Sequence, residues 1–250
     1  MLKKLALATI IASAALLPFA TVNAEGMKIK IATEGAYPPF NGKDAAGNLI
    51  GFDVEIAKAV CAQMKADCTI VAQDWDGIIP GLVAKKYDAI AASMSITAER
   101  LKTVDFTNRY YSNHLRIVAK KGSKLTDAAS LAGKNVGAQR STVAAKWIED
   151  KAGRSATAKL YDTQTAAYSD LKAGRLDALV SDVYPAYDWL KKNPDYEFVG
   201  AKIDIKDLIG IAVRKGDNKL REAINKALDE LRANGKYAEI NKKYFPFDIY

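Results

Sequence analysis

Short strand-like and helix-like segments alternate along this 250-residue chain. The strand-like segments are apolar or alternate apolar with polar residues, and they lie at 28–33, 68–72, 88–91, 114–119, 135–138 and 177–180. The helix-like segments have apolar residues three and four positions apart, and they lie at 53–64, 78–86, 142–151, 163–173 and 220–231, with a further short helix after Gly235. Such alternation is typical of mainly parallel sheets covered by helices on both faces. We therefore predict an α/β protein.

Two local signals predict where helices begin. Asp53 is a residue type that caps helix N-termini, so we expect it to cap the helix at 53–64. Pro80 lacks a backbone N–H and is tolerated best in a first helical turn, which places the start of the next helix close to Ile78.

The alternating pattern occurs twice in succession, and each half has about the length of a small domain. No Pro-, Gly- or Ser-rich linker separates the halves, so the segments near 110–115 and 205–210 are expected to cross between them as short ordered strands. The sequence therefore predicts two α/β lobes.

The N-terminus has the pattern of a signal peptide. Lys3 and Lys4 precede an apolar run at 5–19, and small residues at 22 and 24 predict cleavage after Ala24. The apolar run is short for a bilayer, and no cationic residues follow it to stop transfer. Cleavage removes two lysines and no acidic residue, so the net charge falls from +8 to +6. We expect an exported, periplasmic protein.

The two cysteines are expected to form a structural disulfide. Cys61 and Cys68 lie close together, and an even number of cysteines in an exported protein favours a bridge. A zinc site needs more soft ligands, and the single histidine, His114, is far away in sequence. We expect no metal, and a bridge that ties a helix end to the next strand.

Several function classes lack their sequence signals. The chain has no G-x-x-x-x-G-K-[ST], G-x-G-x-x-G or G-x-S-x-G motif, so we expect no nucleotide or other cofactor. One histidine gives little support for a Ser-His-Asp hydrolase. Lysine and arginine are spread along the chain without a clustered stripe, so nucleic-acid binding is not expected.

Polar residues that suit an anion follow two predicted strands, at the sheet edge where such folds bind ligands. Ser93, Ser95 and Arg100 follow the strand at 88–91, and a guanidinium meets a carboxylate through two parallel hydrogen bonds. Ser141 and Thr142 open a helix, where free N–H groups favour an anion, although the pattern by itself favours simple helix capping.

Other strand ends carry residues that suit a cation. Asp182 follows the strand at 177–180 and can accept from an ammonium group or cap a helix. Glu34 follows the first strand, and the aromatic residue Tyr37 lies three residues later. The aromatic residue Trp75 follows another predicted strand. A carboxylate beside aromatic faces suits an extended cation, whereas the alternative is that both rings belong to the core.

The motifs, taken in order, resemble the polar amino-acid family of periplasmic solute-binding proteins. They are TEGAYPPF (33–40), GFDVEIA (51–57), DWDGIIPGL (74–82), the Ser-x-Ser-Ile-Thr-x-x-Arg run ending at Arg100, GRLDALVSD (174–182) and LDELRANGKYAEINKKYF (228–245). Within the family, the chain is similar to the lysine/arginine/ornithine- and opine-binding branch, which shares the Cys61–Cys68 spacing.

The resemblance implies a type II periplasmic binding protein fold. Two lobes joined by a two-segment hinge would close around one amino acid and deliver it to the permease of an ABC importer in the inner membrane. The expected boundaries are 25–112 and 208–250 for lobe 1 and 113–207 for lobe 2, in a monomer without enzymatic activity.

The resemblance also implies roles for individual residues. Arg100 would bind the ligand α-carboxylate, with backbone N–H groups of Ser95 and Thr142. Ser93, Ser95 and Asp182 would receive the α-ammonium group, Trp75 and Tyr37 would flank the side chain, and Glu34 would pair with a distal positive charge. The implied ligand is arginine, lysine or ornithine, with histidine or an opine as further candidates.

Three residues depart from the family pattern. Ala92 stands where relatives that bind lysine and arginine often have a hydroxyl, and Val143 replaces a frequent polar residue. Arg140 replaces a small residue and would repel a cationic ligand if it pointed inward.

Two other functions remain open at this stage. Some relatives are exported dehydratases of the cyclohexadienyl or arogenate type, which need a dianion pocket and a general acid, and Glu34 could be that acid. An accessory sensing role is the other, and nothing in the sequence separates it from transport.

Overall fold

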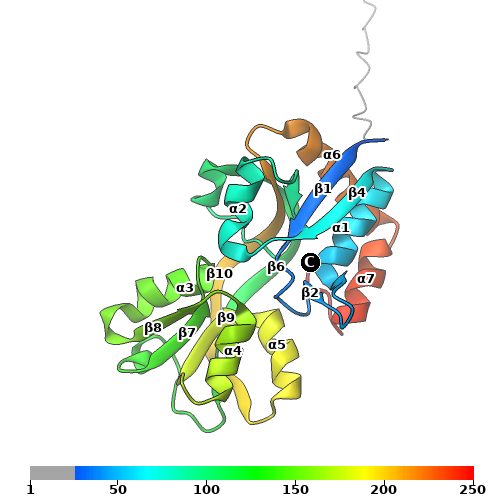
Figure 1. Ribbon diagram of the computed structural model, residues 1–250. Coiled ribbons are helices and arrows are strands. Elements are labelled where there is room, and N and C mark those ends of the chain that lie inside the picture. The colour runs from blue at the N-terminus through cyan, green and yellow to red at the C-terminus, as the bar shows by residue number, and fades with distance from the viewer. Residues whose placement is uncertain (1–25) are drawn as a thin grey trace, which may run out of the picture.

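The computed structural model describes residues 26–250, apart from the side chain of Arg154, and consists of two α/β lobes (Figure 1). Their strands form one continuous eight-stranded sheet in the order β4-β1-β5-β10-β6-β9-β7-β8. The two-lobed α/β fold predicted from the sequence is therefore confirmed. The predicted signal peptide, 1–24, lies outside the described residues.

The first lobe contains the N-terminal half of this sheet. The strands β1 (Lys28–Thr33), β4 (Asp67–Ala72) and β5 (Ala89–Ile90) are parallel, because each is reached through a helical crossover or a long connection. Its other elements are the hairpin β2 (Gly42–Lys43) and β3 (Leu49–Ile50) and the helices α1 (Phe52–Gln63), α2 (Trp75–Val83), α6 (Asn218–Ala233) and α7 (Lys236–Tyr244).

The second lobe repeats this arrangement. Its parallel strands are β7 (Asn135–Gln139), β8 (Thr157–Tyr161) and β9 (Ala178–Asp182). Its helices are α3 (Val143–Trp147), which continues as a π-helical turn (Ile148–Ala152), α4 (Gln164–Lys172) and α5 (Val183–Lys192).

Two long antiparallel strands run through both lobes. They are β6 (Val104–Lys120) and β10 (Tyr196–Arg214), and they contain the segments predicted to cross between lobes as short strands. Their pairing is irregular between Val199 and Ile203 and again between Ile203 and Asp207. The lobe boundaries at 112/113 and 207/208 fall inside these strands and stay predictions.

Each lobe has its own hydrophobic packing on both faces of the sheet. In the first lobe, the apolar stripe of α6 (Leu220, Ile224, Leu228, Leu231) packs with α1 and the C-terminal segment on one face, and α2 covers the other. In the second lobe, α3 covers one face, while α4 and α5 cover the other. Burial of these stripes provides the main driving force for folding.

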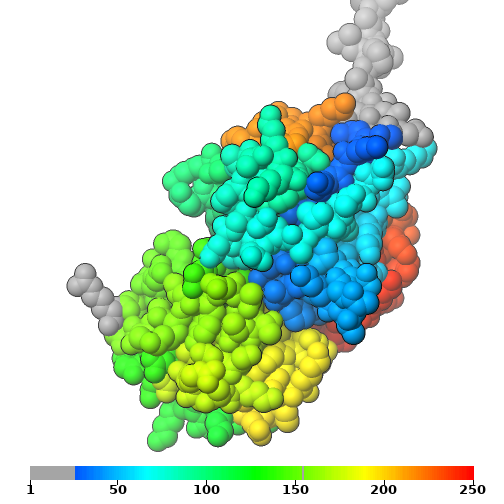
Figure 2. All heavy atoms as spheres, in the orientation of Figure 1, coloured from blue at the N-terminus to red at the C-terminus, as the bar shows by residue number. Residues whose placement is uncertain are grey.

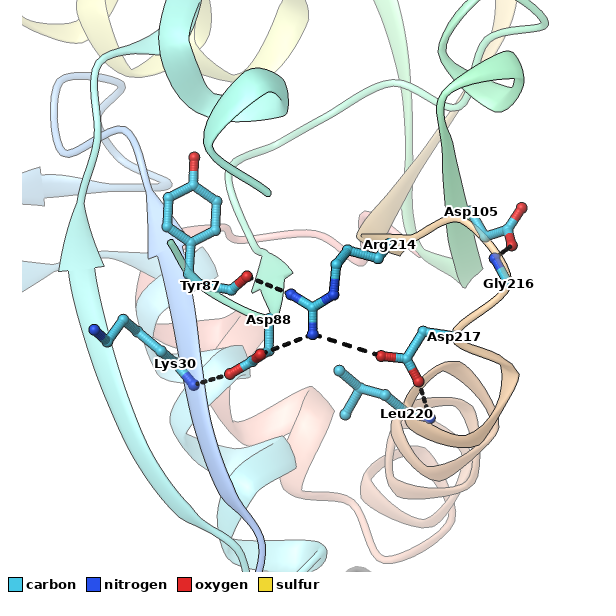
Figure 3. Close-up of polar contacts among 8 residues, drawn as sticks. All are labelled: Lys30, Tyr87, Asp88, Asp105, Arg214, Gly216, Asp217 and Leu220. Carbon is cyan, nitrogen blue, oxygen red and sulfur yellow. Dashed lines mark hydrogen bonds and ion pairs between the residues drawn. The ribbon is translucent and has the colours of Figure 1, made fainter. Parts of the chain in front are cut away.

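A polar network closes the end of the first lobe away from the second (Figure 3). Arg214, at the end of β10, donates to the Tyr87 carbonyl oxygen at 2.6 Å and to Asp88 Oδ1 at 2.9 Å. Asp88 also accepts from the Lys30 backbone N–H at 2.9 Å, and Asp217 caps α6 through the Leu220 N–H. One guanidinium thus links β1, β5, β10 and the start of α6.

Two predicted helix starts are wrong. The helix α1 begins at Phe52 with Gly51 as its N-cap, and Asp53 is buried in the first turn, where its carboxylate binds side chains outside the helix. The helix α2 begins at Trp75, directly after the loop that follows β4, so Pro80 lies in its interior rather than in its first turn. At α1 the backbone N–H groups of Phe52 and Asp53 donate to the carbonyl oxygens of Pro39 and Phe40, so no side-chain cap is needed.

The predicted disulfide between Cys61 and Cys68 is confirmed, and it joins α1 to β4 with the two Cα atoms 6.1 Å apart. Within residues 26–250, no helix is both long and apolar enough to span a bilayer.

Candidate functional site

A small cavity lies where the two lobes meet, and Figure 2 shows the lobes packed against each other. The lining residues are Glu34, Tyr37, Trp75, Ala92, Ser93, Ser95, Arg100, Gln139, Thr142, Val143 and Asp182. Nine of the ten predicted ligand-binding residues are therefore brought together. The tenth, Ser141, lies in an adjoining groove that Arg100 and Thr142 also line. The roles assigned to these residues stay predictions.

Ser93 is held in place by a buried carboxylate of the first lobe. Its backbone is left-handed, with φ of 51°, and its hydroxyl donates to Asp53 Oδ2 at 2.9 Å. Asp53 also accepts from Asn41 Nδ2 at 2.8 Å and from the Tyr110 hydroxyl at 2.6 Å. Burial raises the pKa of Asp53 to about 6, although these hydrogen bonds favour its ionised form. The Ser93 part of the first-lobe wall is thus fixed by contacts within that lobe.

Arg100 supplies the positive charge of the cavity. Its guanidinium donates to the carbonyl oxygens of Ser95 at 2.8 Å and Ser141 at 3.0 Å, and it lies 5.2 Å from the ring centroid of Trp75. Burial lowers the pKa of Arg100, but arginine stays protonated in proteins. Because these partners are neutral, the guanidinium charge is available to an anionic group.

Asp182 is the last residue of β9 and occupies the N-cap position of α5. Its side chain makes no capping hydrogen bond and instead accepts from the Tyr37 hydroxyl at 2.6 Å, across the lobe interface. Burial raises the pKa of Asp182, while hydrogen bonding from Tyr37 and Asn113 and the charge of Arg100 lower it. Its carboxylate therefore faces the cavity rather than the helix.

Thr142 behaves as a helix cap. Its hydroxyl oxygen accepts from the Ala145 N–H at 3.2 Å and its O–H donates to the Gln139 carbonyl oxygen at 2.7 Å. The capping alternative thus accounts for this side chain, and the backbone of Thr142 is the part left to face a ligand.

Glu34 is a buried carboxylate, and the described side chain that it hydrogen-bonds, Gln139, is neutral. Its Oε1 accepts from Gln139 Nε2 at 2.7 Å, and 6% of the residue is exposed. Burial raises the pKa of Glu34 to about 7, and the acidic residues around it, led by Asp74, add to the effect. A positive charge placed beside Glu34 would reverse this shift, because it favours the ionised carboxylate.

Sequence reasoning missed Gln139. It is the last residue of β7, so the strand-end rule that selected the other residues would have found it if the strand had been extended by one position. Of the family departures, Ala92 and Val143 line the cavity. Arg140 does not; its guanidinium lies 3.0 Å from Asp162 and 3.8 Å from Asp76.

The lobes are closed over the cavity by direct contacts between them. Besides the Tyr37–Asp182 and Gln139–Glu34 bonds, the Ser141 hydroxyl donates to Asp76 Oδ1 at 3.0 Å and Thr165 donates to the Ala36 carbonyl oxygen at 3.2 Å. The cavity measures about 20 Å³, which is room for about one water molecule. A larger ligand enters only when the lobes separate or these side chains move.

In the part of the chain that the structure describes, no group of three or more His, Cys, Asp or Glu side chains is arranged to hold a metal ion.

Known proteins of similar sequence and structure are binding proteins. The chain is 45% identical to an L-arginine-binding protein of Pseudomonas aeruginosa over 231 residues, or 89% of each chain. It is 41% identical to a lysine/arginine/ornithine-binding periplasmic protein of Escherichia coli, again over 89% of each chain. Its structure matches an ancestral arginine-binding protein bound to arginine with a TM-score of 0.81 and 38% identity, over 87% of this chain and 98% of the other.

These relatives are binding proteins rather than enzymes, so the dehydratase hypothesis is not supported. The sequence model of one family, the bacterial extracellular solute-binding proteins of family 3, matches residues 29–247, nearly all of the described chain. The chain belongs to family 3 of the bacterial extracellular solute-binding proteins.

Proposed function

We propose that this protein captures a cationic L-amino acid in the periplasm, arginine first among them, and delivers it to the permease of an ABC importer. The charges of the cavity carry the proposal. Two carboxylates, Glu34 and Asp182, and one guanidinium, Arg100, line it. Arginine, lysine and ornithine carry the complementary set of two positive groups and one negative group.

The proposed roles follow from the residue types. Arg100 binds the α-carboxylate, together with the backbone N–H groups of Ser95 and Thr142, because a guanidinium offers two parallel donors. Asp182 binds the α-ammonium group, with hydroxyl oxygens of Ser93 and Ser95 as further acceptors.

The side chain of the ligand would lie between aromatic walls. Tyr37 and Trp75 are 7% and 9% exposed and line the same cavity as Glu34. Aromatic faces pack well against methylene groups and guanidinium planes, and Glu34 would pair with the distal charge. On binding, the distal charge would replace Gln139 as the principal partner of Glu34.

Transport would depend on closure of the lobes. The ligand would contact Arg100 and Glu34 from the first lobe and Asp182 from the second, so it would bind the closed form more tightly than the open form. The family and its relatives support this choice of ligand, since the relatives compared above are named for binding arginine, or lysine, arginine and ornithine.

Isothermal titration calorimetry tests the proposal. The purified protein is titrated with L-arginine, L-lysine, L-ornithine, L-histidine, an opine, L-glutamine and L-glutamate. We expect the tightest binding among the cationic amino acids. Tight binding of glutamine or glutamate, with no heat from any cationic ligand, would overturn it.

The family supports a periplasmic location. We further propose that the signal peptide is cleaved after Ala24 and that the protein is a monomer. Mass spectrometry of the exported protein should give a chain beginning at residue 25, and light scattering should give a monomer. A retained N-terminus or a stable dimer would contradict these expectations.

A further inference from the structure

A further buried carboxylate, Asp207, lies behind the wall of the cavity. It is 5% exposed and does not line the cavity. Its Oδ2 accepts from the Ser95 hydroxyl at 3.2 Å and from Asn113 Nδ2 at 2.8 Å. Ser95 does line the cavity and is 4% exposed, so the hydroxyl of Ser95 stands between Asp207 and the ligand space.

The irregular part of β10 brings Asp207 to this position. The pairing register between β10 and β6 shifts between Ile203 and Asp207, and Lys206 has a left-handed φ of 50°. Such irregularities turn a side chain away from the direction that a regular strand would give it. After the shift Asp207 pairs with Asn113 on β6, at the crossing between the lobes, and its side chain is buried although both neighbours in sequence are exposed.

A serine hydroxyl has one hydrogen to donate and two lone pairs that can accept. When Asp207 is ionised, the hydrogen of Ser95 is directed to it, because an ionised carboxylate accepts only. The lone pairs are then left for the cavity. The hydroxyl can accept a hydrogen bond from a ligand N–H, but it cannot donate to a ligand carboxylate without losing Asp207.

We propose that Asp207 is a positioning residue that makes the Ser95 hydroxyl an acceptor for the ligand α-ammonium group. The proposal rests on the proposed function, since it assumes an amino-acid ligand. It explains how a site rich in hydroxyl groups distinguishes the two ends of an amino acid, which a freely rotating serine does poorly. Ser93 has the same arrangement with Asp53, so both cavity serines turn their hydrogen toward a buried carboxylate outside the cavity.

The charges around Asp207 fit this role. Burial and the charge of Asp182 raise the pKa of Asp207 to about 7, while Asn113, Ser95 and Arg100 lower it. A ligand ammonium group placed between Ser95 and Asp182 would favour the ionised forms of both carboxylates. Binding would therefore strengthen the acceptor arrangement of Ser95 rather than disturb it.

The test compares L-arginine with 5-guanidinopentanoate, which lacks only the α-ammonium group. For each variant we take the ratio of the two affinities by calorimetry. Asp207→Ala removes the acceptor, frees the Ser95 hydroxyl to rotate, and should reduce the ratio about tenfold, as expected for a hydrogen bond to a charged group. Asp207→Asn keeps one oxygen acceptor and should restore most of the ratio. The matched control is Asp204→Ala, an exposed aspartate on the same strand, which should leave the ratio unchanged.

Ser95→Ala shows whether the effect passes through the hydroxyl. It should reduce the ratio by weakening L-arginine while sparing 5-guanidinopentanoate, and Asp207→Ala added to it should reduce the ratio no further. If Asp207→Ala does not fold, Ser95→Ala still tests whether the Ser95 hydroxyl accepts from the α-ammonium group. An equal loss for both ligands, a loss confined to 5-guanidinopentanoate, or an additive effect in the double variant would each overturn the proposal.

Failure of the proposed function is seen separately, in the wild-type protein. If it prefers L-glutamine to L-arginine, the proposed function fails, and the same ratio is measured with L-glutamine and 4-carbamoylbutanoate. If the wild-type protein binds none of the amino acids titrated, the α-ammonium subsite is wrong and this proposal fails with it.

Discussion

The two halves of the site are supported in different ways. On the first lobe, Ser93 is held by Asp53, which is itself held by Asn41 and Tyr110 of the same lobe or its adjoining strand. On the second lobe, the side chains of Asp182 and Gln139 take their partners, Tyr37 and Glu34, from across the cleft. The Ser93 part of the first half is thus formed within one lobe, whereas Asp182 and Gln139 have their partners across the cleft, as does Arg100 through the Ser141 carbonyl oxygen.

This difference indicates an order of events. A ligand would first meet the preformed part of the first-lobe wall around Ser93, and the groups with cross-cleft partners would then exchange these contacts for contacts with the ligand. Preorganised groups lose little freedom on binding, so they suit the first encounter. Groups that change partners suit a closing step, because their free energy differs between the open and closed states.

The largest expected effects come from the charged group that each half contributes. Arg100→Ala and Asp182→Ala should each weaken L-arginine binding by at least about 3 kcal/mol, because a ligand charge would remain buried and unpaired. Calorimetry measures the affinity, and small-angle scattering with saturating L-arginine measures closure. We expect Asp182→Ala to impair closure more than Arg100→Ala does.

Circular dichroism shows whether both variants are folded, and Lys146→Ala serves as a control because its ion pair with Asp150 lies within the second lobe. An unchanged affinity in either variant would remove the role assigned to that residue.

A smaller effect should be confined to the first lobe. Replacing both cysteines by serine removes the Cys61–Cys68 bridge and should lower the free energy of unfolding by about 2–3 kcal/mol, because a short closed loop constrains the unfolded chain. Denaturant unfolding measures the loss. The affinity for L-arginine should change less than about twofold, since a disulfide between α1 and β4 does not line the cavity. A tenfold loss of affinity would show that the first-lobe wall is less independent than its hydrogen bonds indicate.

Glu34 gives a pH-dependent effect. Its pKa is about 7 without ligand, and a neighbouring ligand cation would lower it, so the ionised form binds better. Affinity for L-arginine should therefore be highest above pH 7 and fall about tenfold between pH 8 and pH 6, as the carboxylate gains a proton.

The variant Glu34→Gln isolates this contribution. It should bind L-arginine more weakly at pH 8 and show a flatter pH profile. The slope that persists belongs to the carboxylates Asp182 and Asp207, whose pKa values are also raised by burial. An affinity in the wild-type protein that stays constant or rises on acidification would show that Glu34 does not pair with a cation.

Much of the fold could be predicted because periodic patterns report burial on one face. Most of the predicted strands have fully buried residues, although β4 has only half-buried and exposed ones. The strand β8, at the edge of the sheet, was missed, and its residues are almost all exposed. The helix α5 was missed because Pro185 reads as a helix breaker, although it stands in the first turn, where a proline is tolerated.

The site was predictable to the extent that it lies at strand ends. Glu34, Arg100 and Asp182 follow strands and converge, as the rule for open α/β sheets requires. The roles of Asp53 and Asp207 could not be read from the sequence, since they depend on buried partners far along the chain. The direction of Arg140 was also open, because its partners are far away in sequence or follow the unpredicted strand β8: Asp162 lies in the same lobe and Asp76 across the cleft.

A change at Arg140 should have the smallest effect on the affinity for L-arginine, although Arg140 contacts Asp76 across the cleft. Its guanidinium is 44% exposed, and its pair with Asp76, which crosses the cleft, is 3.8 Å long. Exposed ion pairs contribute about 0–1 kcal/mol and are screened by salt. Arg140→Ala should thus weaken L-arginine binding less than about threefold, and the difference should disappear at high salt. Tighter binding in the variant would instead mean that the charge of Arg140 reaches the cavity and opposes a cationic ligand, as the sequence had left open.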